Sequence, residues 1–143
     1  MAVFEFVSIT CVEPSEVAGD EVFVDFNGVK VFPGAERSFH RFKKGTQVVN
    51  TEARYDSVAL QALAEGDDTT SLADIPGAEA LARHTIEDTG LLIRVMEHDL
   101  MSSDDVLGRI LVPDRSENGL QKRRLEGDGG HYVLSFLVHA GVS

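Results

Sequence analysis

The sequence contains no tryptophan, two tyrosines and a single cysteine, Cys11. One cysteine cannot form an internal disulfide, and its place in an apolar run favours a buried, unreactive thiol. No apolar run approaches the roughly 18 residues that a membrane-spanning helix needs. The start, MAVFEFVSIT, lacks the basic beginning of a signal peptide. We therefore expect a cytoplasmic or peripheral membrane protein.

Positive charge is also scarce. Thirteen Lys and Arg residues are outnumbered by 24 Asp and Glu residues, which gives a formal net charge of −11. A surface of this sign repels phosphate, so the composition argues against nucleic-acid binding. A chain of 143 residues with 43% hydrophobic content can bury a core without disulfides. The composition predicts a single domain, residues 1–143.

Common catalytic patterns are missing. The five histidines never pair at i and i+4, and neither His-Glu-x-x-His nor Gly-x-Ser-x-Gly occurs. Glycine-rich phosphate cradles are absent as well. We therefore expect no enzyme. A hydrolase that uses a carboxylate pair on a carbohydrate, or one that acts on a lipid, is a remote alternative, and Tyr55 and Tyr132 offer few platforms for stacking sugars.

Alternating apolar residues separated by turn signals predict an antiparallel β-sandwich of about eight strands. The pair Asn27-Gly28 between two alternating runs is typical of a tight hairpin. A short helix is possible over residues 78–84, and residues 113–130 are polar with a flexible turn at 127–130. The expected strands cover residues 2–12, 21–26, 29–32, 38–49, 57–64, 131–139 and the two apolar runs within 91–112.

The most informative stretch is residues 91–112, which reads as strand, acidic loop and strand. Glu97 and Asp99 are two positions apart, so they leave the same face at the end of the first strand. Asp105 returns to them from the far side of the loop. Unit charges about 5 Å apart repel by roughly 3 kcal/mol at an effective dielectric near 20. Converging carboxylates therefore favour a hard cation, and ligation by oxygen alone favours Ca²⁺; a solvated acidic turn is the alternative.

This stretch also resembles a known family. Residues 96–108, MEHDLMSSDDVLG, resemble the third calcium-binding loop of the C2 domain family, except that Glu97 stands where the family usually has Asp. Residues 20–24, DEVFV, resemble the end of the family's first calcium loop. Glu13 then stands where the earlier acid of that loop lies, with Glu16, or neither residue, as the alternatives. The resemblance implies a C2-like sandwich with the permuted, type II strand order, in which residues 131–139 take the place of the other variant's first strand.

The resemblance further implies a noncatalytic calcium-binding module that docks on anionic phospholipid. Leu100 and Met101 at the loop tip would dip into the lipid, and Lys43 and Lys44 would meet its head groups. A solvated strand face for the lysines and a protein contact for the loop tip are the alternatives. A structural or protein-interaction module of a larger assembly, without lipid binding, is the competing function. The implied calcium ligands are Glu13, Asp20, Glu97, Asp99 and Asp105.

Overall fold

The structure, a computed structural model, describes residues 1–54, 68–99 and 103–141. These residues form eleven strands, one short α-helix and one 3₁₀ turn. The strands are β1 (Val3–Glu13), β2 (Asp20–Phe26), β3 (Val29–Phe32), β4 (His40–Phe42), β5 (Thr46–Val49), β6 (Asp68–Ser71), β7 (Arg83–Thr85), β8 (Leu91–Glu97), β9 (Asp105–Val112), β10 (Gln121–Gly127) and β11 (Gly130–His139). The helical elements are η1 (Leu72–Asp74) and α2 (Glu79–Ala82).

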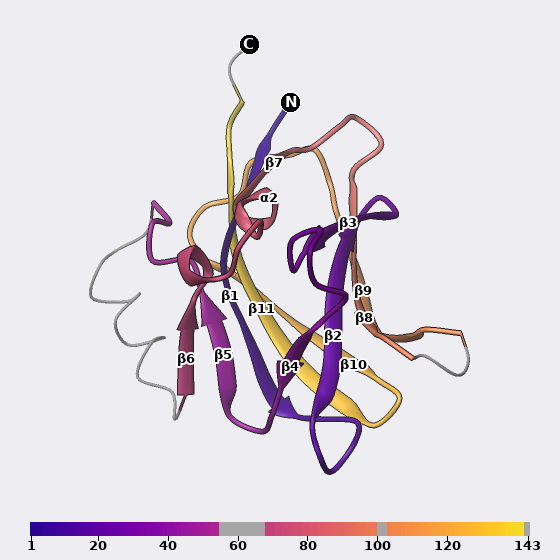
Figure 1. Cartoon of the computed structure of the whole chain (residues 1–143). Helices are drawn as coiled ribbons and strands as arrows, with labels where there is room; N and C mark the ends of the chain where they lie inside the picture. The colour runs from indigo at the N-terminus through magenta and orange to yellow at the C-terminus, as the bar shows by residue number, and fades with distance from the viewer. Residues whose placement is uncertain (55–67, 100–102, 142–143) are drawn as a thin grey trace.

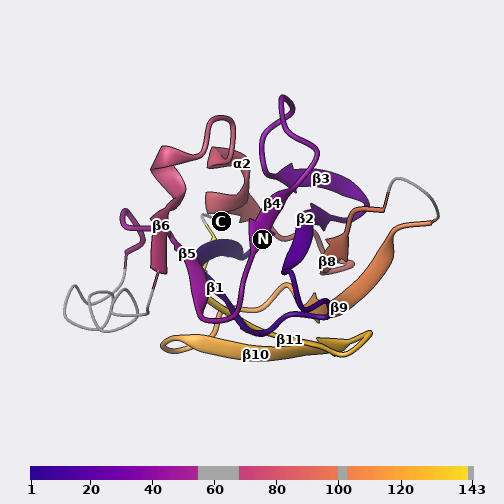
Figure 2. The same ribbon diagram turned by 60° about the horizontal axis from the view of Figure 1, so that its bottom comes forward.

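The strands build two facing sheets (Figures 1 and 2). One sheet has the order β10-β11-β1-β5-β6, with β7 also paired to β1. The other has the order β3-β2-β8-β9, with β4 also paired to β2. Every pairing is antiparallel except that of β5 with β6. The last strand, β11, lies beside β1. The predicted antiparallel β-sandwich is thus confirmed, with eleven strands among the described residues in place of eight.

Alternating side chains from both sheets fill the space between them. The largest members are aromatic: the ring of Phe4 packs against Phe26 at 5.3 Å and against Phe136 at 5.2 Å between centroids. Phe42 meets Tyr132 edge to face at 5.7 Å. All five are buried in one continuous apolar cluster. Successive side chains of a strand point to opposite faces of its sheet, and one face of each sheet packs against the other sheet. Alternating apolar residues in the sequence therefore predicted this core.

The two sheets approach each other closely where β9 faces β10. A Cβ atom on Gly108 would lie 2.6 Å from the Cβ of Leu125, and one on Gly127 would lie 2.7 Å from the carbonyl oxygen of Leu107. Real Cβ atoms do not come so near, so the absence of side chains at these two positions permits the approach. The hairpin of β10 and β11 is thereby drawn against the start of β9.

Some sequence-based boundaries were wrong. Residues 38–49 form two strands in different sheets, because the chain turns at Gly45 and the hydroxyl of Thr46 closes that turn on Lys43. The polar stretch 113–130 contains strand β10, which pairs along its whole length with β11. Of the helix expected at 78–84, only the single turn α2 forms, because residues 83 and 84 belong to β7, which pairs with β1. The strand expected at 57–64 lies outside the described residues.

Within the described residues, no helix is long and apolar enough to cross a bilayer.

Replacing Gly108 by Ala tests the close approach of β9 and β10. The added methyl must displace Leu125, so we expect the free energy of unfolding to fall by about 1–3 kcal/mol. Urea denaturation followed by circular dichroism measures the change. Arg109→Ala, at the exposed neighbouring position, is the control and should change stability by less than about 0.5 kcal/mol. Equal stability of Gly108→Ala and the native chain would contradict the proposed packing.

Candidate metal centre

Three connections meet at one end of the sandwich. They are the loop from β1 to β2 (residues 14–19), the described parts of the connection from β8 to β9 (residues 98–99 and 103–104) and the turn from β10 to β11 (residues 128–129). Strand register brings the first two together, since Val22 pairs with Glu97 and the amide of His98 donates to the carbonyl of Glu21 at 2.7 Å. Pairing of Glu13 with His131 brings the third beside the first.

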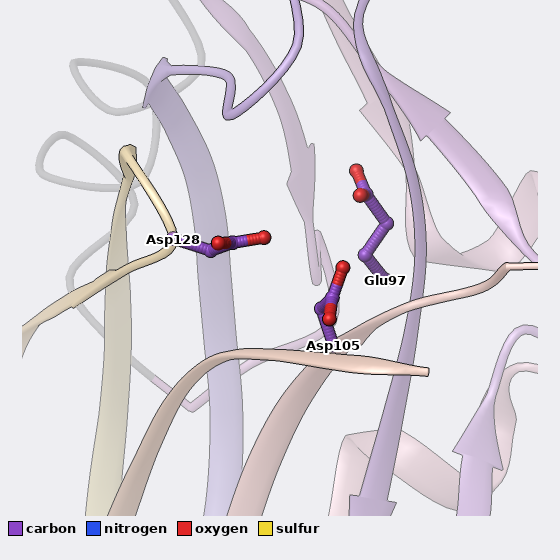
Figure 3. A group of neighbouring side chains, drawn as sticks. All are labelled: Glu97, Asp105 and Asp128. Atoms are coloured by element: carbon purple, nitrogen blue, oxygen red, sulfur yellow. The ribbon is translucent and has the colours of Figure 1, made fainter. Parts of the chain in front are cut away.

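Three carboxylates from this end converge. One oxygen each from Glu97, Asp105 and Asp128 lies within 4.8 Å of the others. Glu97 ends β8 and pairs with Asp105, which begins β9. Asp128 extends from its turn toward Asp105 (Figure 3). Thus the sequence-predicted pair of Glu97 and Asp105 meets a third acid that the sequence reasoning did not select.

Asp128 reaches this position through its turn. Asp128 and Gly129 both have positive φ, 53° and 82°, and link Gly127 to Gly130 in a two-residue hairpin. Asp-Gly is a favoured sequence for such a turn. The available signal was therefore the Asp-Gly pair before the last strand. Residues 127–130 were predicted only as a flexible turn, so Asp128 was not predicted as a ligand.

Asp20 lies behind these three and is fully buried. The hydroxyl of Tyr132 donates to Oδ2 at 2.6 Å, and the amide of Ser15 donates to the same atom at 2.9 Å. The Ser15 hydroxyl and the amide of Glu16 donate to Oδ1 at 2.7 and 3.1 Å. Each oxygen thus accepts two hydrogen bonds, which fills the acceptor positions of a carboxylate. Asp20 therefore closes the 14–19 loop and ties it to β11.

Asp20 and Glu97 influence each other's protonation. The Ser15 oxygen also lies 3.2 Å from Glu97 Oε2, so one hydroxyl bridges the two carboxyl groups. Burial alone would raise the pKa of Asp20, but hydrogen bonds from Tyr132 and Ser15 outweigh it and lower this pKa. Burial first, then the hydrogen bond to Asp20 and its charge, raise the pKa of Glu97 to about 8. At neutral pH Asp20 is thus ionised, and Glu97 holds a proton between the two groups.

The outer part of the cluster is strongly negative. The charge of Asp128 is the largest cause of a raised pKa at Asp105, and the charges of Asp99 and Asp104 act in the same direction. Asp128 is exposed and Asp105 partly so. No Lys, Arg or His among the described residues forms a salt bridge with Glu97, Asp105 or Asp128. The charges of Asp105 and Asp128 therefore face each other and solvent.

The remaining predicted residues lie around this centre. Glu13 faces Lys44, with 3.3 Å between Oε2 and Nζ. The charge of Glu16 helps to raise the pKa of Glu97, so of these two acids Glu16 is the one whose charge acts on the cluster. The amide of Asp99 donates to Asp104 Oδ1 at 2.9 Å. Lys43 and Lys44 form the turn after β4, next to the 14–19 loop.

Leu100 and Met101 lie outside the described residues. The start of their loop is held from the side: the ring of His98 stacks on Phe39 at 5.7 Å between centroids.

The donor set suits a hard cation of calcium's size. Calcium–oxygen distances of about 2.3–2.6 Å allow ligand atoms on opposite sides of the ion to be about 5 Å apart. The separations within the cluster fall inside this limit. Magnesium at about 2.1 Å requires a tighter octahedral arrangement. The described residues offer no sulfur or imidazole within the cluster, which disfavours zinc.

Comparison with known proteins finds no matching family model and no matching curated protein. Among solved structures, the chain is similar to a C2 domain, with a TM-score of 0.45 and 11% identity over 98% of this chain and 99% of the other.

The chain is also similar to human GIVD cytosolic phospholipase A2 in complex with methyl γ-linolenyl fluorophosphonate, with a TM-score of 0.40 and 10% identity over 99% of this chain. It spans 17% of that protein. With all scores below 0.5, the architecture assigned to this chain is defined by its own strand pairing.

The pKa of Glu97 predicts a pH-dependent effect of Glu97→Gln on metal-free protein. Because the fold raises this pKa from 4.5 to about 8, the stability that protonated Glu97 contributes is complete below pH 4.5 and is lost as pH rises through 8. A glutamine amide stays neutral and can donate to the hydroxyl oxygen of Ser15, which lies 3.2 Å from Glu97 Oε2. We expect the variant to equal the native chain near pH 5 and to be more stable by roughly 4 kcal/mol at pH 9, since the pKa of Glu97 lies about three units above pH 5 and each unit is worth about 1.4 kcal/mol.

Urea denaturation in chelator between pH 5 and 9 provides this measurement, in a range where Asp20 remains ionised. Glu13→Gln is the matched control, because Glu13 lies at the same end but is exposed and faces Lys44. Its stability should run parallel to that of the native chain. Parallel curves for Glu97→Gln as well would show that Glu97 is not protonated in the fold.

Proposed function

We propose that the chain is a noncatalytic, calcium-binding C2-like module that docks on anionic phospholipid membranes. The observation that carries the proposal is the convergence of Glu97, Asp105 and Asp128 from separate strands and turns at one end of the sandwich. Such a cluster is unfavourable by itself. A divalent cation turns the repulsion into shared coordination.

In this proposal Glu97, Asp105 and Asp128 supply the protein oxygens nearest the ion. Asp99 adds charge and lies close enough to act on Asp105. Asp20 contributes its negative charge from behind, while its oxygens keep the hydrogen bonds to Ser15 and Tyr132. When calcium is present, it neutralises the cluster and can also accept a phosphate oxygen from a lipid head group.

Membrane docking is supported by what surrounds the cluster. Val17, in the 14–19 loop, is fully exposed to solvent. An apolar side chain at a loop tip is suited to enter the interfacial region of a bilayer. The Lys43-Lys44 turn lies at the same end and would meet anionic head groups. Leu100 and Met101, which follow Asp99 in the sequence, remain predicted lipid-facing residues.

The noncatalytic part of the proposal is supported by the state of the candidate reactive group. Cys11 is buried, and burial is the main cause that raises its pKa to about 11. A thiol in this state is a poor nucleophile.

Calcium titration by calorimetry tests the ligand set. We expect Asp105→Asn and Asp128→Asn each to weaken calcium binding by about tenfold or more, because each removes a charged ligand. Glu13→Gln, at the same end but outside the converging group, should change the affinity by less than about twofold. If Asp128→Asn bound calcium with native affinity, Asp128 would not be a ligand of the proposed site.

Co-sedimentation with phosphatidylserine-containing vesicles tests the docking surface. We expect calcium to shift the native chain to the vesicles and Val17→Ser to need several times more lipid for the same shift, since it loses apolar contact area. Val29→Ser is the matched control, because Val29 is also an exposed valine but follows the Asn27-Gly28 turn at the opposite end. Equal losses in both variants, or binding that persists in chelator, would contradict calcium-dependent docking through this end.

A further inference from the structure

The outer edge of β10 carries a basic strip. Lys122, Arg123 and Arg124 are consecutive and exposed. With Arg109 on β9 and Arg115 between the two strands, they make up five of the thirteen Lys and Arg residues of a chain with a net charge of −11. Of these five, Arg115 pairs with Glu117 at 3.2 Å. The calcium site does not use them. A concentration of positive charge on so acidic a protein calls for its own explanation.

The backbone along this strip is also open. β10 is an edge strand, paired within the described chain only to β11. The two-residue turn makes Gly127 and Gly130 a hydrogen-bonded pair, and alternate pairs then follow through Leu125 and Arg123. The amide and carbonyl groups of Lys122 and Arg124 therefore point away from β11. The carbonyl of Lys122 accepts a hydrogen bond from the exposed guanidinium of Arg123 at 3.0 Å, which an added strand would replace. An extended segment can form main-chain hydrogen bonds with these groups.

Beside the open edge lies a small groove. Here β9 and β10 diverge and leave a space of about 70 Å³, lined by apolar side chains that include Ile110, Val112 and Phe136. The guanidinium of Arg123 covers the Phe136 ring at 5.7 Å from its centroid. Leu111, on the rim, is 63% exposed. At the other end of the strand the groove closes, because Gly127 packs against the carbonyls of Val106 and Leu107.

We propose that the open part of β10 binds an extended acidic peptide as an added antiparallel strand. Residues of the peptide opposite Lys122 and Arg124 would share their face of the sheet, where opposite charges pair favourably. The residue between them would face the groove beside Arg123. The recognised pattern is therefore acid, apolar, acid, in a segment of about five residues.

A peptide fits this surface better than a membrane does. At about 3.3 Å per residue, Lys122 lies about 16 Å along β10 from Gly127 at the acidic end. This is about two Debye lengths at physiological salt, so a bilayer in contact with the acidic end leaves the far part of the strip free. The outward backbone groups, moreover, match a strand and have no counterpart in lipid. The surface thus offers a second contact that does not depend on calcium.

Fluorescence anisotropy with labelled, acetylated Glu-Val-Glu-Val-Glu tests this inference on the full chain in chelator. We expect saturable binding that weakens as salt increases. The Lys122→Glu/Arg124→Glu double variant should bind at least tenfold more weakly and should gain binding to Lys-Val-Lys-Val-Lys. That exchange of preference shows that the variant is folded. Lys43→Glu/Lys44→Glu, which changes the same number of charges at the acidic end, should bind the acidic peptide as the native chain does.

Two further probes can overturn the proposal. A Glu-Val-Glu-Val-Glu peptide methylated on its glutamate amides keeps its charge but cannot pair with the edge, so it should lose at least tenfold in affinity. Equal binding of this peptide, or native-like binding by the Lys122/Arg124 variant, would rule out strand addition. Strand addition would also be ruled out if the native chain did not bind the peptide and the Lys122/Arg124 variant lost affinity for phosphatidylserine vesicles. The strip would then bind a membrane.

Discussion

The structure depends on how two buried carboxyl groups, Asp20 and Glu97, are accommodated side by side. They belong to strands far apart in the sequence, and the hydroxyl of Ser15 bridges them. Two ionised carboxylates in this environment would repel strongly. Asp20 keeps its charge because Tyr132 and the loop amides donate to it, and Glu97 keeps a proton. The loops are therefore held together at one end, while the negative charge of the outer acids is not compensated by this hydrogen bonding.

This constraint gives the end of the sandwich its chemical character. The inner pair is satisfied by hydrogen bonds and a proton. The outer acids, Asp105 and Asp128, are in contact with solvent, and the charge of Asp128 acts on Asp105. Their meeting depends on the close approach of β9 and β10, which only glycine permits at residues 108 and 127. The packing of β9 against β10 therefore also sets the positions of the candidate ligands Asp105 and Asp128. Binding of a divalent cation is the function that this arrangement supports best.

Some of this could be predicted from the sequence. The spacing of Glu97, Asp99 and Asp105 between apolar runs indicated both the loop and the convergence, because strand period and chain reversal are local properties. Asp20 was also identified, at the start of its strand. What the spacing does not contain is that Asp20 is saturated by a tyrosine 112 positions away. Hydrogen-bond saturation depends on tertiary packing, so residue type alone left Asp20 and Glu97 with the same role.

Asp128 was missed for a related reason. Strand β10 is polar, with three consecutive cations, so its sequence does not alternate as a half-buried strand does. Only Leu125 is buried, and it packs where Gly108 leaves room. Because the sequence did not predict β10, the position of the turn that carries Asp128 could not be predicted either. The crossing of residues 38–49 between sheets was hidden similarly, because a turn at Gly45 divides one continuous pattern.

The most direct test of the shared cation site is a crystal structure of the protein soaked with a lanthanide, which replaces calcium and is located by its anomalous scattering. The account predicts a strong peak coordinated by oxygens of Glu97, Asp105 and Asp128, with Asp20 still hydrogen-bonded to Tyr132. A peak at another part of the surface, or carboxylates at this end that point apart with no ion between them, would contradict it.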